Sequence, residues 1–87
     1  MNFNNLERDI LWKLWRNRCF GKGHMLINNV LRGFPRDRQK EFKNAIDSLI
    51  KKGILLKKPT KHGDAIYINA KLRIEIREIL KKYHDFL

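Results

Sequence analysis

Disulfides, membrane spans and export signals are all missing from this sequence. Cys19 is the only cysteine among 87 residues, so no disulfide can form within the chain and we expect a reducing compartment. No apolar run approaches the roughly 18 residues that a transmembrane helix needs. The first residues include Glu7 and Asp9 and lack the basic and apolar regions of a signal peptide. We therefore expect a soluble, cytoplasmic protein, associated with the nucleoid if the source is prokaryotic.

Acidic residues are scarce as well. The chain has 9 Asp and Glu against 20 Lys and Arg, which gives a net charge of +11 and a pI near 10.2. An excess of this size attracts polyanions, and nucleic acid is the commonest of them. Hydrophobic residues make up 43% and are spread through the sequence. We therefore expect residues 1–87 to fold as one small domain and not to form a basic disordered tail.

Arrangements typical of catalysis or metal binding are not found. His24, His62, His84 and Cys19 are scattered and lack the paired spacing of zinc ligands. No nucleophile stands beside a base, and the acidic residues fall mainly at helix caps or next to basic residues. The Gly-Lys-Gly segment at residues 21–23 lacks the spacing of a nucleotide-binding loop and indicates a turn. We predict no enzymatic activity, no cofactor, no metal and no identifiable small-molecule ligand.

Residues 42–55 carry the clearest structural pattern in the chain, and the rest of the predicted fold is arranged around them. They combine a helical apolar pattern with a following run of aliphatic residues that is typical of a strand. One helical face gathers the apolar residues Phe42, Ile46, Leu49 and Ile50. The opposite face is polar and carries Lys40, Asn44, Ser48 and Lys51, with Lys43 and Asp47 on its shoulders.

The limits of this helix are predicted at residues 36–52. It begins just after Pro35, and Asp37 is the best candidate for its N-cap. Gly53 follows two lysines, which suit the negative end of the helix dipole, and a glycine at this position closes a helix at low cost.

Three further helices and one hairpin complete the predicted fold. Asn4 or Asn5 caps a helix over about residues 5–18, and a second helix covers about residues 24–31. Two β-rich segments at residues 54–58 and 65–69 flank a connection at residues 59–64 with a basic tip, which predicts a β-hairpin. Asn69 caps a last helix over about residues 70–86. The predicted class is mainly α with a small β-hairpin.

This order of elements resembles the winged helix-turn-helix superfamily. The motif that carries the resemblance is the end of a helix followed by a strand, Ile46-Asp47-Ser48-Leu49-Ile50-Lys51-Lys52-Gly53-Ile54-Leu55. It looks most like small archaeal and bacterial regulators of the MarR-like and ArsR-like kind. The resemblance implies a three-helix core, a β wing and a C-terminal helix. It also implies that the helix at residues 36–52 enters the major groove of DNA and that the wing at residues 57–64 lies on the backbone.

The resemblance and the positions of the polar groups together predict the nucleic-acid-binding residues. The family pattern puts four helical residues nearest base edges and phosphates and three at the wing. Asn44 has the amide that pairs with adenine, and Gln39, which projects nearer the core, is another base reader along with Arg38. The full predicted set is Arg36, Arg38, Gln39, Lys40, Lys43, Asn44, Ser48, Lys51, Lys58, Lys61 and His62. In the alternative interpretation these groups only solvate a helix surface.

The last helix has two interpretations. Leu72, Ile76, Ile79, Tyr83 and Phe86 form a heptad-like stripe. It either folds back on the first helix to complete the core, or forms a homodimer interface from residues 70–86 and 5–18, with Trp12 exposed.

For function we expect binding of double-stranded DNA by a transcription regulator. The alternatives are a winged-helix module that binds protein or RNA within a larger assembly, and a chromatin-like protein that binds DNA without sequence preference.

Overall fold

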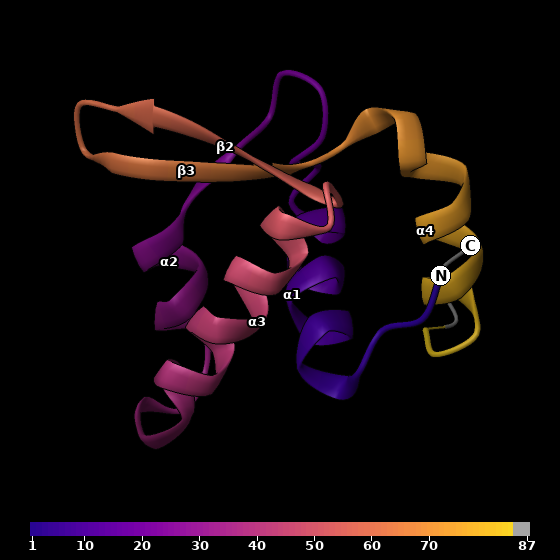
Figure 1. Cartoon of the computed structure of the whole chain (residues 1–87), viewed down its shortest axis with the longest axis horizontal. Helices are drawn as coiled ribbons and strands as arrows, with labels where there is room; N and C mark the ends of the chain where they lie inside the picture. Colours follow the sequence, from indigo (N-terminus) through magenta and orange to yellow (C-terminus); the bar gives the residue numbers. More distant parts are fainter. Residues whose placement is uncertain (85–87) are drawn as a thin grey trace.

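The computed structural model describes residues 1–84 and contains four helices and a three-stranded antiparallel sheet (Figure 1). The predicted order of three helices, a hairpin and a last helix is confirmed. The elements are α1 (Asn5–Arg16), β1 (Met25–Leu26), α2 (Ile27–Arg32), α3 (Gln39–Lys51), β2 (Leu55–Thr60), β3 (Gly63–Ile68) and α4 (Arg73–Lys81). The last helix was predicted over about residues 70–86, and this is wrong at its end: α4 stops at Lys81, and residues 82–84 are not helical. Phe86 lies outside the described residues.

Helix α1 begins at a reciprocal cap. The Asn4 side chain accepts a hydrogen bond from the Glu7 backbone N–H at 2.8 Å, and the Glu7 carboxylate accepts one from the Asn4 backbone N–H at 3.0 Å. This arrangement satisfies two backbone donors at the helix start. Glu7 is buried and its carboxylate also lies 3.3 Å from Lys52 Nζ, so it joins the start of α1 to the end of α3.

Helix α1 ends two residues earlier than predicted. Arg18 has a φ of +55°, in the left-handed region, so the helix cannot continue through it. The Cys19 backbone N–H then donates to the carbonyl of Leu14 at 2.9 Å, which closes the last turn. The following turn brings Gly23 against Arg18, where an added Cβ would overlap the Arg18 carbonyl.

The sheet has a third strand that was not predicted. Met25 pairs with Ile66 and Leu26 pairs with Ala65, so β1 lies beside β3 in the order β1-β3-β2. Residues that were predicted to open the second helix are therefore extended. Helix α2 starts only at Ile27 because the two preceding residues pair with the hairpin.

Helix α3 is preceded by a 3-10 turn, Arg36–Arg38. The predicted N-cap, Asp37, is wrong: the cap position is Arg38, which makes no side-chain capping bond. At the other end the prediction is confirmed. Gly53 has a φ of +74°, and the Ile54 N–H donates to the Leu49 carbonyl at 3.0 Å.

The hairpin strands are longer than predicted. Residues 59–64 were expected to be a connection, but β2 runs to Thr60 and β3 starts at Gly63. Pro59 is tolerated in a strand because β2 lies at the edge of the sheet. Only residues 61–62 form the turn, which the Thr60 hydroxyl steadies by donating to the Gly63 carbonyl at 2.6 Å.

The core lies between α1, α3, α4 and one face of the sheet. Fully buried aliphatic side chains come from all four of these elements: Ile10, Leu11, Leu14, Ile46, Leu49, Leu55, Ile66, Ile68, Ile76 and Leu80. Helix α4 thus completes the core, as one of the two interpretations predicted. It follows a 3-10 turn, Ala70–Leu72, that Asn69 caps as predicted by accepting from the Lys71 N–H.

Helix α4 and helix α2 lie on opposite sides of α1 (Figure 1). Trp12 is half-buried and its ring stacks on that of His84, with centroids 4.1 Å apart, so the expectation of an exposed Trp12 is wrong. On the other side, Lys13 Nζ donates to the Asn29 and Val30 carbonyls at the end of α2. Burial, and secondarily Arg16, lower the pKa of Lys13.

Candidate nucleic-acid interface

The outer face of α3 is the first part of the candidate interface. Phe42, Ala45, Ile46 and Leu49 turn inward and are buried, so the polar residues at the other angular positions must face outward. Four of the predicted residues are exposed there, and Ser48 is half-buried. The exposed four are Lys40, Lys43, Asn44 and Lys51.

The turn of the hairpin is the second part. Lys61 and His62 form the turn itself and are exposed. The His62 backbone N–H donates to the Thr60 hydroxyl oxygen at 3.2 Å, so the turn has a defined shape. Lys58 is exposed on β2, opposite Ala65 of β3. Its neighbour Lys57 points to the other face of the strand and lies 3.9 Å from Asp64.

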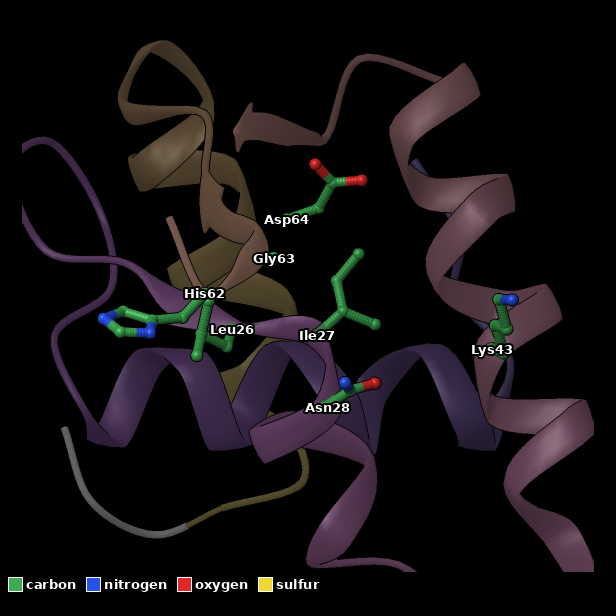
Figure 2. A pocket seen from close by; sticks show the side chains of 7 residues that line it. All are labelled: Leu26, Ile27, Asn28, Lys43, His62, Gly63 and Asp64. Atoms are coloured by element: carbon green, nitrogen blue, oxygen red, sulfur yellow. The ribbon is translucent and has the colours of Figure 1, made fainter. Parts of the chain in front are cut away.

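A cleft of about 200 Å³ joins these two parts (Figure 2). We call it the α3–hairpin cleft. Lys43 lines it from α3, while His62 and Asp64 line it from the hairpin and Asn28 from α2. Asp64 is the acidic residue among its lining residues, and it is half-exposed and already paired with Lys57. The structure thus brings Lys43 and His62, which are distant in sequence, to one concave site.

A second cleft, of about 400 Å³, lies between α2 and the start of α3. Arg32 and Arg36 line this α2–α3 cleft, and Asn28 lines both clefts, so the two are adjacent along α2. Gln39 also lines it, but its Nε2 donates to the Leu31 carbonyl at 3.1 Å. This bond holds α3 against α2 and occupies one of the donors that base reading would use.

Ion pairing divides the cations of this region into two groups. Arg38 pairs with Glu41 at 3.2 Å, and Lys52 and Lys57 pair with Glu7 and Asp64. Within residues 1–84, the other six cations between positions 36 and 61 have no ion pair with an acidic group. These six exposed residues are Arg36, Lys40, Lys43, Lys51, Lys58 and Lys61.

The predicted residues are not all equally close together. Lys51 lies in the last turn of α3, which adjoins the root of the hairpin and not its turn (Figure 1). Two residues of α2 that line the clefts, Asn28 and Arg32, were not predicted at all. Two exposed polar residues on a short helix are a weak sign of a binding surface in the sequence alone. They become informative only when α2 is known to lie beside the start of α3.

The described residues hold few groups suited to other chemistry. Within residues 1–84, no cluster of three or more His, Cys, Asp or Glu could hold a metal ion. Over the same residues, no helix combines the length and apolar character that crossing a bilayer requires. No family model, curated protein or solved structure matches the chain. The proposed function therefore rests on the shape and the charge of the surface formed by α3, the hairpin and α2.

Proposed function

We propose that this chain is a winged helix-turn-helix domain that binds double-stranded DNA and acts as a transcription regulator. The observation that carries the proposal is the α3–hairpin cleft, a concave surface that Lys43 of α3 and His62 of the hairpin turn both line (Figure 2). In this reading α3 is the recognition helix, and the hairpin β2–β3 is the wing. The topology of helices followed by a hairpin supports it.

The dimensions of α3 suit a major groove. Its 13 residues give a rod about 20 Å long, and a helix about 10–12 Å across fits a groove about 12 Å wide. One face of the helix is buried in the core, while the other offers Lys43, Asn44 and Ser48 to the duplex. Asn44 is exposed and suited to a bidentate contact with adenine.

The six unpaired cations provide the attraction to phosphate. Each cation placed on a phosphate releases condensed counterions, and the slope of log K against log salt is about −0.9 per contact. If all six bind phosphates, the slope is about −5. Arg36 adds a contact from the loop before α3, in the α2–α3 cleft that also contains Arg32.

The experiment is a fluorescence-anisotropy titration against a random duplex, single-stranded DNA and structured RNA at several salt concentrations. The expected result is preference for the duplex with a steep salt slope. A subsequent selection for tight sites should give a specificity ratio above about 10³ for a regulator. Equal binding to all duplexes would indicate a chromatin-like protein, and preference for RNA or weak binding throughout would overturn the DNA proposal.

A matched pair of variants locates the surface. Lys43→Glu should weaken duplex binding about tenfold or more, because it replaces a phosphate contact with a repulsive charge. Lys82→Glu changes the net charge equally but lies just after α4, on the other side of α1 from α2. If both variants weaken binding to the same extent, the net charge and not this surface is responsible.

Dimerisation through residues 5–18 and 70–86 stays a prediction. Large apolar side chains that are exposed on or just after α4 are Ile74 and Tyr83. The Arg8 guanidinium lies 3.9 Å from the centroid of the Tyr83 ring, so part of that surface is already covered within the protomer. Sedimentation at micromolar concentration measures the oligomeric state directly.

A further inference from the structure

A groove of about 660 Å³ lies on the α1–α4 side of the molecule. We call it the arginine groove. Its lining includes four exposed arginines, which come from the end of α1, the residue after its cap and the first half of α4: Arg16, Arg18, Arg73 and Arg77. Its apolar part consists of the half-buried rings of Trp12, Trp15 and Phe20.

The arginines are arranged around the rings. The Arg73 guanidinium lies 4.5 Å from the centroid of the Phe20 ring, and the Arg16 guanidinium lies 5.4 Å from that of Trp12. A guanidinium that stacks on a ring keeps its N–H edge available for a carboxylate or phosphate. Arg77 pairs weakly with Glu78 at 3.8 Å, and both side chains are about half-exposed. No acidic residue is among those that line this described groove.

The backbone of Arg18 is a further sign that its side chain is needed here. Its position, one residue beyond the cap of α1, is equivalent to that of Gly53 beyond the cap of α3. Both residues have positive φ, but only glycine adopts that conformation without steric cost. Strain of this kind points to a role for the side chain that stability alone does not explain.

We propose that the arginine groove binds an acidic segment of a partner protein in which glutamate or aspartate residues flank an apolar side chain. Arginine and tryptophan are the residues that protein interfaces favour at their energetic centres. The carboxylates bind the guanidinium groups in bidentate fashion, and the apolar side chain packs on the aromatic rings. The proposed DNA surface, by contrast, is mainly lysine, which suits a less directional contact with phosphate.

Two other occupants fit less well. A second copy of the chain would place four arginines against the same four across a two-fold axis, and like charges in an interface repel. A DNA duplex presents its phosphates on a convex surface and has no apolar group for the rings at the floor. The groove lies on the side of α1 that faces α4, whereas α2 and the hairpin turn lie on the other side (Figure 1). A peptide and a duplex can therefore bind together.

The two tryptophans of the chain are both in this groove, which makes their emission a local probe. The experiment titrates the full chain with an acetylated ten-residue peptide of glutamate and leucine that contains no aromatic residue. Saturable change in tryptophan emission is the expected result. The same peptide with glutamine in place of glutamate should bind at least tenfold more weakly. Equal binding of the two peptides would overturn the proposal.

Variants that replace two cations with neutral glutamine test the arginines. Arg73→Gln/Arg77→Gln should weaken peptide binding at least tenfold, while the control Lys81→Gln/Lys82→Gln, with the same loss of charge near the end of α4, should change it less than threefold. Thermal melting of each variant confirms that it is folded. The proposal fails if the two double variants bind alike, if duplex DNA displaces the peptide in direct competition, or if the emission changes only as the chain self-associates.

Discussion

Replacing Arg18 with glycine should make the protein more stable, although arginine lies there naturally. The chain after α1 closes with two hydrogen bonds, from the Arg18 N–H to the Trp15 carbonyl at 3.0 Å and from the Cys19 N–H to the Leu14 carbonyl at 2.9 Å. This closure requires the left-handed backbone that Arg18 adopts, with φ +55°.

The size of the effect follows from two opposing terms. A residue with a Cβ costs roughly 1–2 kcal/mol in the left-handed region. Glycine avoids that cost but adds freedom to the unfolded chain, which offsets roughly 0.4–1 kcal/mol. The net gain in the free energy of unfolding is about 0.5–1 kcal/mol. For a domain of this size that corresponds to a rise in Tm of about 2–8 °C.

Thermal melting followed by circular dichroism measures this shift. Arg18→Ala is the matched control, because it removes the side chain but keeps the Cβ, and its Tm should stay near that of the wild type. Gly53→Ala is the reciprocal change: no atom lies within 4 Å of the added Cβ, so a loss of about 1 kcal/mol would come from backbone strain alone. If Arg18→Gly and Arg18→Ala shift the Tm equally, the strain argument is wrong.

Two other residues give independent tests. Glu7→Ala should destabilise the protein by about 1–2 kcal/mol in urea titrations, because it removes the acceptor of the Asn4 N–H at the helix cap together with the ion pair to Lys52. Glu7→Gln keeps the cap and loses only the ion pair with half-exposed Lys52, at a cost below about 1 kcal/mol. Equal losses would contradict that division. Cys19 is 2% exposed and burial raises the pKa of its thiol, so Ellman's reagent should label it slowly in the native protein and rapidly in urea. Because the pKa of the thiol is higher in the folded state than in the unfolded chain, its contribution to the free energy of unfolding is fully present below the ordinary thiol pKa. That contribution is lost as the pH rises through the pKa of the folded state, and Cys19→Ala should not show this loss. Rapid native labelling would refute the burial argument.

The fold was predictable where local rules decide it. The apolar spacing of residues 42–50 and the glycine at position 53 belong to one helix, and both predictions about them are confirmed. The fold was not predictable where distant segments meet. Met25 pairs with Ile66, forty-one residues further along the chain, and nothing near Met25 indicates a strand. The edge position that tolerates Pro59 is likewise a property of the whole sheet.

The candidate interface was predictable to a similar extent. Exposure of Lys43, Asn44 and the hairpin turn follows from periodicity and turn composition. The clefts do not, because Asn28 reaches them only through the packing of α2 beside α3 and β3. The arginine groove was not predictable for the same reason. Arg18 and Arg73 are far apart in sequence and become neighbours only when α4 folds back beside α1.

The edge position of β2 has a consequence for the behaviour of the protein at high concentration. An open strand edge offers unpaired backbone groups to other chains, which is a common route to aggregation. Pro59 removes one donor from this edge, and Lys57 and Lys58 add adjacent charge that repels a second copy. The same lysines that give the hairpin its charge thus also keep its edge from pairing with another molecule.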